Sequence, residues 1–349
     1  MDHLERRLNK KVYKTLNGPS FMSKEAQSAM FRSIISCFPS KSVLVLGDAI
    51  IDEYVYCKDG GFSLSSPRAK KLIYERKEVF RGGAGNVAEN LLALGAQVSL
   101  VTLVGFDEEA DQQYNHWDHP SLRFYAIDKV TRGSNVKTRY CVGDEKIFAV
   151  ERLNREPISK GEEDEVIKLV KSKGEDYDMV IFQDQNHGFF SKTLIDRLRE
   201  VITEKKKVLV NSQTYSDQSR YEDYTGFGTM FMNLREARLV DSKFNPDGDG
   251  RLLTETLDSD VCVTLGDKGA VLFKDEKRYH APRLPITPVD TCGAGDAFLS
   301  AFAVSDYRND PQTALSLANI WAGLSTLKMG TRPSKIEELI DRIKNLPEV

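Results

Sequence analysis

The sequence contains few of the residues that mark disulfide-bonded, metal-bound or membrane-embedded proteins. Its five cysteines are scattered and none has CxxC spacing, which argues against a disulfide scaffold or a zinc site and indicates reduced thiols. No apolar run approaches the length needed to cross a bilayer. The net charge of −3 provides no basic field for nucleic acid or an anionic membrane. We therefore expect a cytoplasmic protein that binds neither.

A P-loop is also absent, because no segment reads GxxxxGK[ST]. The 349 residues, 40% of them hydrophobic, are enough for one large core or two unequal lobes. Residues 1–40 are rich in Lys and Arg, contain the breaker Gly18-Pro19 and include a short amphipathic helical pattern. We expect these residues to form an N-terminal extension and residues 41–349 to form the main domain.

Short apolar runs alternate with helical patterns along the main domain. The runs cover residues 42–47, 98–104, 179–182, 208–210 and 261–265, and the helical patterns cover 86–94, 162–171, 192–204 and 234–240. Continuous apolar runs are typical of strands that are buried on both faces of a parallel sheet. The alternation predicts an α/β fold with helices on both faces of a mostly parallel sheet.

Two segments, residues 54–80 and 122–152, interrupt this alternation with period-two patterns. The second includes a hairpin pattern, with strands at 136–142 and 147–150 around a turn at Gly143-Asp144. One-sided alternation indicates a small sheet that lies across one end of the main domain. Such an inserted sheet would act as a lid or as a dimer contact, because its apolar face needs a cover.

Residues 290–296 read DTCGAGD and precede an apolar helical run. Gly293, Ala294 and Gly295 leave their N–H groups accessible at the start of the expected helix, where the helix dipole favours an anion. Asp296 falls in the first turn, beside that anion site. Phosphoryl transfer to an alcohol needs this arrangement, because one group takes the proton while the other stabilises the transferred charge. A plain loop–helix junction is the alternative interpretation.

Two acidic residues follow the first expected strand. Asp48 comes directly after it, and Asp52 lies one helical turn further on. Ligands of open α/β sheets bind at the carboxyl ends of the strands. Asp48 is therefore placed to accept hydrogen bonds from ligand hydroxyls, and Asp52 either does the same or caps a turn.

A glycine-rich stretch precedes the next expected helix. Gly82 and Gly83 allow a ligand to approach the backbone, and Asn86 can both donate and accept hydrogen bonds. The stretch also fits the dinucleotide pattern G-x-G-x-x-A from Gly83 to Ala88, which leaves an NAD-dependent oxidoreductase as an alternative. That pattern should follow a buried strand, whereas a charged amphipathic segment precedes it here.

Asn233 and Glu236 are three residues apart on one face of an expected helix. They could position Mg²⁺, which binds oxygen ligands and keeps several waters, or they could form an N-cap with a capping-box Glu. Thr264, Gly266 and Gly269 lie in a strand–turn–strand segment, which is either an ordinary hairpin or one wall of a nucleotide site.

Taken in order, these segments resemble those of the PfkB (ribokinase-like) carbohydrate kinases over residues 41–345. The resemblance implies a three-layer α/β/α sandwich with a mostly parallel central sheet and a small β-sheet lid. It further implies ATP-dependent transfer of the γ-phosphate to a sugar hydroxyl, with Asp296 as general base and the N–H groups of Gly293, Ala294 and Gly295 as the anion hole.

The same resemblance assigns the remaining site residues. Those expected to bind the sugar or its phosphate, with Asp52 added from the residue pattern, are Asp48, Asp52, Gly82, Gly83, Asn86, Lys137, Arg139 and Asp184. Those expected around ATP are Thr264, Gly266, Gly269, Asn319 and Lys328, and Asn233 and Glu236 would organise Mg²⁺ through water. Lys137 and Arg139 are the candidates for a sugar phosphate, because a dianion needs cationic partners; a solvated strand face is their alternative role.

Within the family, the heptose-7-phosphate kinases of lipopolysaccharide precursor synthesis are the enzymes that this chain resembles at residues 47–56, 82–95, 136–139 with 152–153, and 327–331. This implies phosphorylation of C1 of D-glycero-D-manno-heptose 7-phosphate. The chain departs from those enzymes at residues 211–213, which read NSQ where they usually read DPK, and at residues 183–185, which read QDQ in place of SDY. A kinase for another sugar or nucleoside and a catalytically silent binding protein are the alternatives, although the retained Asp296 argues against the second. A monovalent cation such as K⁺ near residues 290–292 and a homodimer through the lid are further implications.

Overall fold

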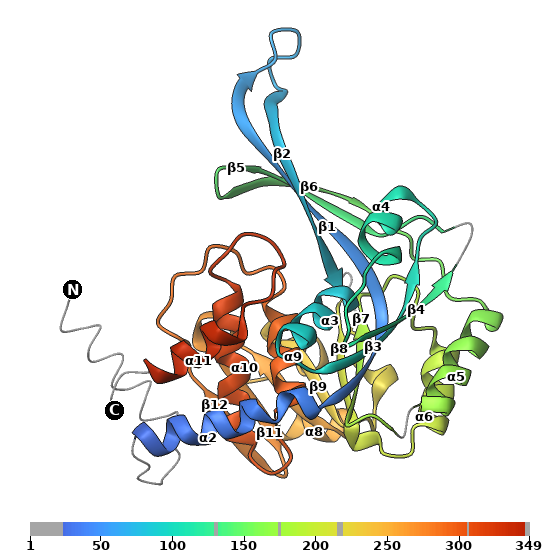
Figure 1. Ribbon diagram of the computed structural model, residues 1–349, viewed down its shortest axis with the longest axis vertical. Helices are drawn as coiled ribbons and strands as arrows, with labels where there is room; N and C mark the ends of the chain where they lie inside the picture. Colours follow the sequence, from blue (N-terminus) through green and yellow to red (C-terminus); the bar gives the residue numbers. More distant parts are fainter. Residues whose placement is uncertain (1–23, 129–131, 174–175, 215–218, 306, 346–349) are drawn as a thin grey trace.

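The computed structural model describes residues 24–345, apart from 129–131, 174–175, 215–218 and 306. A twisted sheet forms the centre of the molecule, helices cover both of its faces, and a group of strands projects from one end (Figure 1). The helices are α2 (Lys24–Ser36), α3 (Ala84–Ala93), α4 (Glu108–Ala110), α5 (Lys160–Lys173), α6 (Lys192–Val201), α7 (Leu234–Val240), α8 (Arg251–Leu257), α9 (Ala294–Val304), α10 (Pro311–Ser325) and α11 (Ile336–Lys344). Among the residues described, no helix is both long enough and apolar enough to cross a bilayer.

The main sheet has the strand order β12-β11-β10-β9-β8-β7-β1-β3-β4, and neighbouring strands are parallel except in the antiparallel pairs β10–β11 and β11–β12. The strands are β1 (Ser42–Phe62), β2 (Lys70–Gly83), β3 (Gln97–Val104), β4 (Leu122–Asp128), β5 (Val136–Val142), β6 (Glu145–Arg152), β7 (Met179–Asp184), β8 (Val208–Ser212), β9 (Thr229–Asn233), β10 (Asp260–Thr264), β11 (Ala270–Lys274) and β12 (Lys277–Ala281). The predicted mostly parallel α/β sheet is confirmed.

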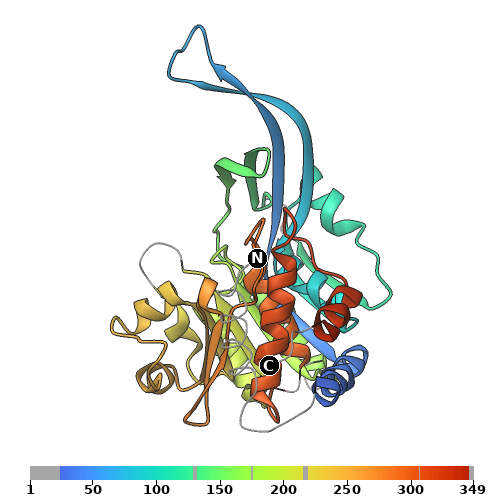
Figure 2. The same ribbon diagram turned by 90° about the vertical axis from the view of Figure 1, so that its left-hand side faces the viewer.

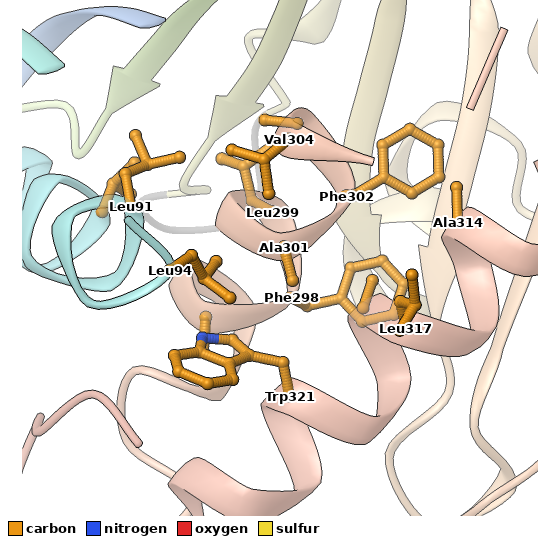
Figure 3. Packing of buried hydrophobic residues seen from close by; sticks show 14 of the residues in the cluster. Leu91, Leu94, Phe298, Leu299, Ala301, Phe302, Val304, Ala314, Leu317 and Trp321 are labelled. Atoms are coloured by element: carbon orange, nitrogen blue, oxygen red, sulfur yellow. The ribbon is translucent and has the colours of Figure 1, made fainter. Parts of the chain in front are cut away.

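Two hydrophobic cores, one on each face of the sheet, establish the three layers. Buried side chains of α2, α3, α9, α10 and α11 form the first core, and those of α5, α6, α7 and α8 contribute to the second. Figure 3 shows part of the first core, where α9 packs between α3 and α10. Phe31 and Ile35 of α2 are buried in the same core, so the helix in the N-terminal segment packs on the main body.

Strand β1 is longer than the sequence predicts. The apolar run predicts a strand that ends at Gly47, whereas β1 continues for 21 residues. Its first part pairs with β3 and β7 in the main sheet, and from Ala49 onward it pairs with β2. The resulting hairpin rises far out of the body (Figure 2). The prediction that Asp52 lies one helical turn beyond Asp48 is therefore wrong, because this backbone is extended by its pairing with β2.

The lid consists of the outer part of β1 together with β2, β5 and β6. The predicted hairpin turn at Gly143-Asp144 is confirmed, since β5 and β6 pair across it. The assignment of residues 122–128 to the lid is wrong, because β4 pairs with β3 at the edge of the main sheet. An edge strand and a lid strand both have one partly covered face, so their sequence patterns are alike.

Candidate active site

A cavity of about 800 Å³ lies between the lid and the start of α9. It brings together most of the residues that the sequence selected: Asp52, Gly83, Lys137, Arg139, Asn233, Glu236, Thr264, Gly266, Gly269, Gly293, Ala294, Gly295, Asp296 and Asn319. The other selected residues, which the structure also describes, do not line it: Asp48, Gly82, Asn86, Asp184 and Lys328.

Asp296 stands in the first turn of α9 and is held by two amides from other elements. Asn86 Nδ2 of α3 donates to Oδ2 over 2.8 Å, and Gln183 Nε2 of β7 donates to Oδ1 over 2.8 Å. Burial raises the pKa of Asp296 to about 7, Asp52 acts in the same direction, and the two amides partly oppose the shift. A carboxyl group with this pKa can accept a proton near neutral pH.

The anion-binding backbone predicted at residues 293–295 has a conformation that requires glycine. Gly293 is the N-cap of α9 with φ 77°, in the left-handed region. A Cβ atom there would lie 2.6 Å from Asn86 Nδ2, so a side chain at this position would press on the amide that holds Asp296. The Ala294 N–H donates to the Thr291 carbonyl oxygen over 3.3 Å, whereas no backbone hydrogen bond is made by the N–H groups of Gly293 and Gly295 among the described residues. Together with the dipole of the eleven residues of α9, the latter two suit an anion in the cavity.

Asp48 and Asp184 are buried and hold loops together. The Asp48 carboxylate accepts hydrogen bonds from the backbone N–H groups of Gln185, His187 and Phe189. Asp184 accepts from Ser212 Oγ, Tyr224 Oη and the N–H of Asn186, and it pairs with Arg220. Their contacts thus fix the loop after β7, and the structure does not bring these two carboxylates to the cavity wall.

The end of the cavity beside the lid contains two cationic side chains with different surroundings. Arg139 Nη1 lies 2.5 Å from Asp52 Oδ1, so this buried pair largely neutralises itself. Lys137, from the same strand β5, lines the cavity and has no ion pair with any residue that the structure describes. Gly82 packs directly on Asp52, since a Cβ there would lie 2.3 Å from Asp52 Oδ2.

At the opposite end, Asn233 and Glu236 form the capping box that was one of the two interpretations. Asn233 Oδ1 accepts from the Glu236 N–H over 3.0 Å, and Glu236 Oε2 accepts from the Asn233 N–H over 2.8 Å. Both residues also line the cavity, together with Thr264 and Gly266. The strand–turn–strand segment therefore does form a wall of the cavity.

Lys328 was assigned to the ATP site, but the structure places it elsewhere. Its Nζ lies 2.9 Å from Glu338 Oε1, on an exposed surface. The sequence pattern could not exclude this, because a flexible lysine near a loop can pair with any nearby carboxylate.

Asn233 and Glu236, at their end of the cavity, fit an Mg²⁺ ion that is held through water molecules rather than enclosed by protein ligands. The chain supplies oxygen atoms from Glu236 and Asn233 at the cavity wall, and Mg²⁺ usually keeps several of its waters. Within the described part of the chain, no group of three or more His, Cys, Asp and Glu side chains is placed to enclose a metal ion.

The segment before the anion hole fits a monovalent cation poorly. The buried Asp290 carboxylate already accepts from Tyr54 Oη, from the N–H groups of Cys292 and Gly330, and from Lys146 Nζ at 2.5 Å. Burial acts to raise the pKa of Asp290, but Lys146 and the N–H groups of Cys292 and Gly330 together hold it below its usual value. A metal ion at this carboxylate would have to displace the Lys146 ammonium.

Sequence reasoning missed Gln183 and Lys146. Gln183 could have been found, because it precedes Asp184 near the carboxyl end of a buried strand, where ligand-binding residues gather. Lys146 has no such signal. It reaches Asp290 only because the β5–β6 hairpin folds over the loop at residues 290–292.

A buried carboxyl group with a raised pKa, in the first turn of a helix whose N-terminus lines a cavity at a doubly covered parallel sheet, is the arrangement expected of one class of protein, a phosphotransferase with an alcohol group as acceptor. The family follows from comparison with known proteins. Residues 40–338 match the model of the pfkB family of carbohydrate kinases, and the chain belongs to this family. The oxidoreductase alternative is wrong, since Gly83 ends β2, an antiparallel lid strand rather than a buried parallel one.

Curated relatives and solved structures agree with this assignment. The chain is 29% identical to the bifunctional protein HldE of Geobacter metallireducens over 312 residues, 86% of this chain and 62% of that protein. It is 30% identical to HldE of a Caulobacter species over 314 residues, 87% of this chain and 63% of that protein. The chain thus spans just under two thirds of these relatives.

Two solved structures show the same fold at low identity. Phosphofructokinase-2 from Escherichia coli in complex with potassium superposes with a TM-score of 0.68 at 13% identity, covering 88% of this chain and 99% of that one. Ribokinase from Thermotoga maritima superposes with a TM-score of 0.65 at 19% identity, covering 87% of this chain and all of that one. The predicted ribokinase-like sandwich is confirmed.

Proposed function

We propose that this chain is a cytoplasmic kinase that transfers the γ-phosphate of ATP to the C1 hydroxyl of D-glycero-D-manno-heptose 7-phosphate. The observation that supports phosphoryl transfer is the position of Asp296, whose carboxyl group has a pKa of about 7 beside the N-terminus of α9. The choice of sugar is supported by the resemblance of residues 47–56, 82–95 and 327–331 to heptose-7-phosphate kinases.

In this proposal Asp296 accepts the proton of the sugar hydroxyl while the N–H groups of residues 293–295 stabilise the charge on the transferred phosphoryl group. Lys137 binds the phosphate already present on the sugar, because its ammonium faces the cavity without an ion pair among the described residues. Glu236 and Asn233 would hold Mg²⁺ through water, and the ion would neutralise charge on the ATP phosphates. The lid closes over the sugar and excludes water.

The proposal includes a homodimer through the lid. Phe148 and Val150 of β6 and Tyr74 of β2 are exposed on the lid strands, and an open sheet with apolar side chains favours a cover.

A substrate panel tests the proposed function. ADP release is measured with heptose 7-phosphate, the unphosphorylated heptose, fructose 6-phosphate, ribose and adenosine, and the position of the new phosphate is read by ³¹P NMR. We expect turnover with heptose 7-phosphate to exceed all others. If only another compound of the panel were phosphorylated, that sugar or nucleoside would replace the heptose in the proposal. If none were phosphorylated, the proposed kinase activity toward these acceptors would be contradicted.

The variant Lys137→Met extends the panel. Loss of one cationic partner of a dianion should raise KM for the phosphosugar about tenfold or more, with little change in kcat and none in KM for ATP. Lys58→Met, at an exposed lid lysine paired with Glu75, is the matched control. An equal rise in KM for the unphosphorylated sugar would mean that Lys137 does not contact the phosphate.

For the monovalent cation, we propose that Lys146 supplies the positive charge beside Asp290. The wild-type rate should then be the same in potassium and in tetramethylammonium buffers. Lys146→Met should lower kcat by about tenfold, because a buried carboxylate loses its ion pair, and K⁺ should restore part of the loss. Lys77→Met, which breaks a lid ion pair with Glu53, is the control. Strong activation of the wild type by K⁺ would contradict this proposal.

A further inference from the structure

A chain of hydrogen bonds joins the hydrophobic core to Asp296. Trp321 Nε1 donates to Asn90 Oδ1 over 2.9 Å, Asn90 Nδ2 donates to Asn86 Oδ1 over 3.0 Å, and Asn86 Nδ2 donates to Asp296 Oδ2 over 2.8 Å. Trp321 lies on α10, the two asparagines on α3 and Asp296 on α9. Figure 3 shows the Trp321 ring extending from α10 toward α3. The bonds thus connect three helices in one line.

The direction of every bond in this chain follows from its first member. An indole nitrogen can only donate, so Asn90 must present its oxygen to Trp321 and its NH₂ group to Asn86. Asn86 then presents its oxygen to Asn90 and its NH₂ group to Asp296. The Asn90 NH₂ group also donates to the backbone oxygen of Asn86 over 2.9 Å, which reinforces this orientation.

Trp321, Asn90 and Asn86, which we call the relay, are shielded from water. Trp321 is 0% exposed, and Asn90 and Asn86 are each 1% exposed. A buried polar group that loses its partner has no water to replace it, and the free-energy cost is large. If the Asn86 amide were reversed, its oxygen would face the Asp296 carboxylate oxygen, and no water could enter to separate the two.

We propose that Trp321 and Asn90 are positioning residues for phosphoryl transfer, because they fix the Asn86 amide with its NH₂ group rather than its oxygen toward Asp296. This inference rests on the role of Asp296 as the base in the proposed function. Neither Trp321 nor Asn90 lines the cavity, although Asn319, two residues before Trp321, does so.

The consequence for Asp296 is electrostatic. A donor at Oδ2 favours the ionised carboxylate, and an amide oxygen in its place would favour the protonated acid. The other groups that act on Asp296 are Gln183 on β7, which donates to Oδ1, Asp52 on β1 and Lys137 on β5; Arg139 pairs with Asp52. The relay variants leave all of these side chains unchanged.

The first experiment is the pH dependence of kcat/KM in Trp321→Phe, which removes the indole N–H and keeps an aromatic ring. The acid limb should move upward by about one pH unit, so that activity falls about fivefold at neutral pH and returns toward wild type in alkaline buffer. Ile320→Val is the control, because it trims the same helix in the core and leaves the relay intact. The control should lower thermal stability slightly and leave the acid limb where it is.

A mutant cycle then tests whether Trp321 acts through Asn86. In the Asn86→Ala background the relay no longer reaches Asp296, so Trp321→Phe should add no further shift of the acid limb. Asn90→Leu breaks the relay at its middle and should shift the limb in the same direction as Trp321→Phe. It keeps the test decisive if Trp321→Phe is too unstable to purify.

A direct readout comes from the indole N–H signals in ¹⁵N NMR, since the chain has two tryptophans. The Trp321 signal, assigned by its loss in Trp321→Phe, should titrate with the midpoint of the acid limb, and this titration should vanish in Asp296→Asn. If Asp296→Asn keeps normal turnover, the proposed function fails on its own. If Asp296→Asn is inactive but Trp321→Phe lowers kcat/KM equally at every pH, the relay is overturned while the function stands.

Discussion

Asp296→Asn is expected to lower kcat by about 10²–10⁴-fold, the usual contribution of a positioned general base. The substitution keeps the size of the side chain but removes the group that accepts the proton. ATP should still bind, because Thr264, Gly266 and Asn319 line the cavity independently of this carboxyl group. Steady-state kinetics and calorimetric titration with a non-hydrolysable ATP analogue measure the two quantities separately.

The pH profile sharpens this prediction. The pKa of Asp296 in the free enzyme is raised to about 7, so the base form is lost as the pH falls through that value and the wild-type kcat/KM should fall with it. In Asp296→Asn the small residual rate should no longer follow this limb. Asp267→Asn, at another carboxylate of the cavity wall, is the matched control and should keep the limb. Near-normal turnover of Asp296→Asn would contradict the assignment of the base.

The parts of the fold that sequence predicts are those with local signals. Continuous apolar runs revealed the parallel strands, and Gly143-Asp144 revealed the turn of the β5–β6 hairpin. The same local reasoning ended β1 at Gly47, because it could not foresee that β2 would return alongside and supply partners from Ala49 onward. The length of a strand depends on pairing with distant segments, and the local sequence of the strand does not indicate that pairing.

The candidate site shows the same division. Residues 293–296 line the cavity at the start of α9, where the sequence predicts them, because a glycine-rich segment followed by a helix start is a local signal. Asp48 was selected for its position at a strand end and Asp184 through the family resemblance, yet their oxygens are occupied by loop N–H groups and buried side chains. Whether a carboxylate at a strand end binds ligand or holds a loop depends on which donors the loop brings to it, and sequence does not provide that.

Strand β1 belongs both to the main sheet and to the lid. Its inner part lies in the main sheet, and its outer part carries Asp52 and Tyr54 into the lid. Asp52 pairs with Arg139 of β5, while Tyr54 donates to Asp290 ahead of the anion hole. A movement of the lid would therefore act at the same time on the Asp52–Arg139 pair and on the segment at Asp290 that precedes α9.

Gly293→Ala is expected to produce the second largest loss, about 10²–10³-fold in kcat, as for removal of an anion-hole donor. Two physical effects combine. Alanine in the left-handed region costs about 1–2 kcal/mol, and its Cβ would lie 2.6 Å from Asn86 Nδ2. The backbone must shift, which misaligns the N–H groups at the start of α9 and disturbs the amide that holds Asp296.

Gly143→Ala separates backbone strain from the effect on the site. Gly143 also has a positive φ, 59°, but a Cβ there has no atom within 4 Å, and the residue lies at the tip of the lid hairpin. It should therefore lose a similar amount of thermal stability and keep far more activity than Gly293→Ala. If the two variants had a similar fall in melting temperature and also lost a similar fraction of kcat, the anion hole would not depend on Gly293. A selective loss at Gly293 instead requires that the turn before α9 and the Asn86–Asp296 contact form one rigid unit, since a flexible junction would absorb a single methyl group.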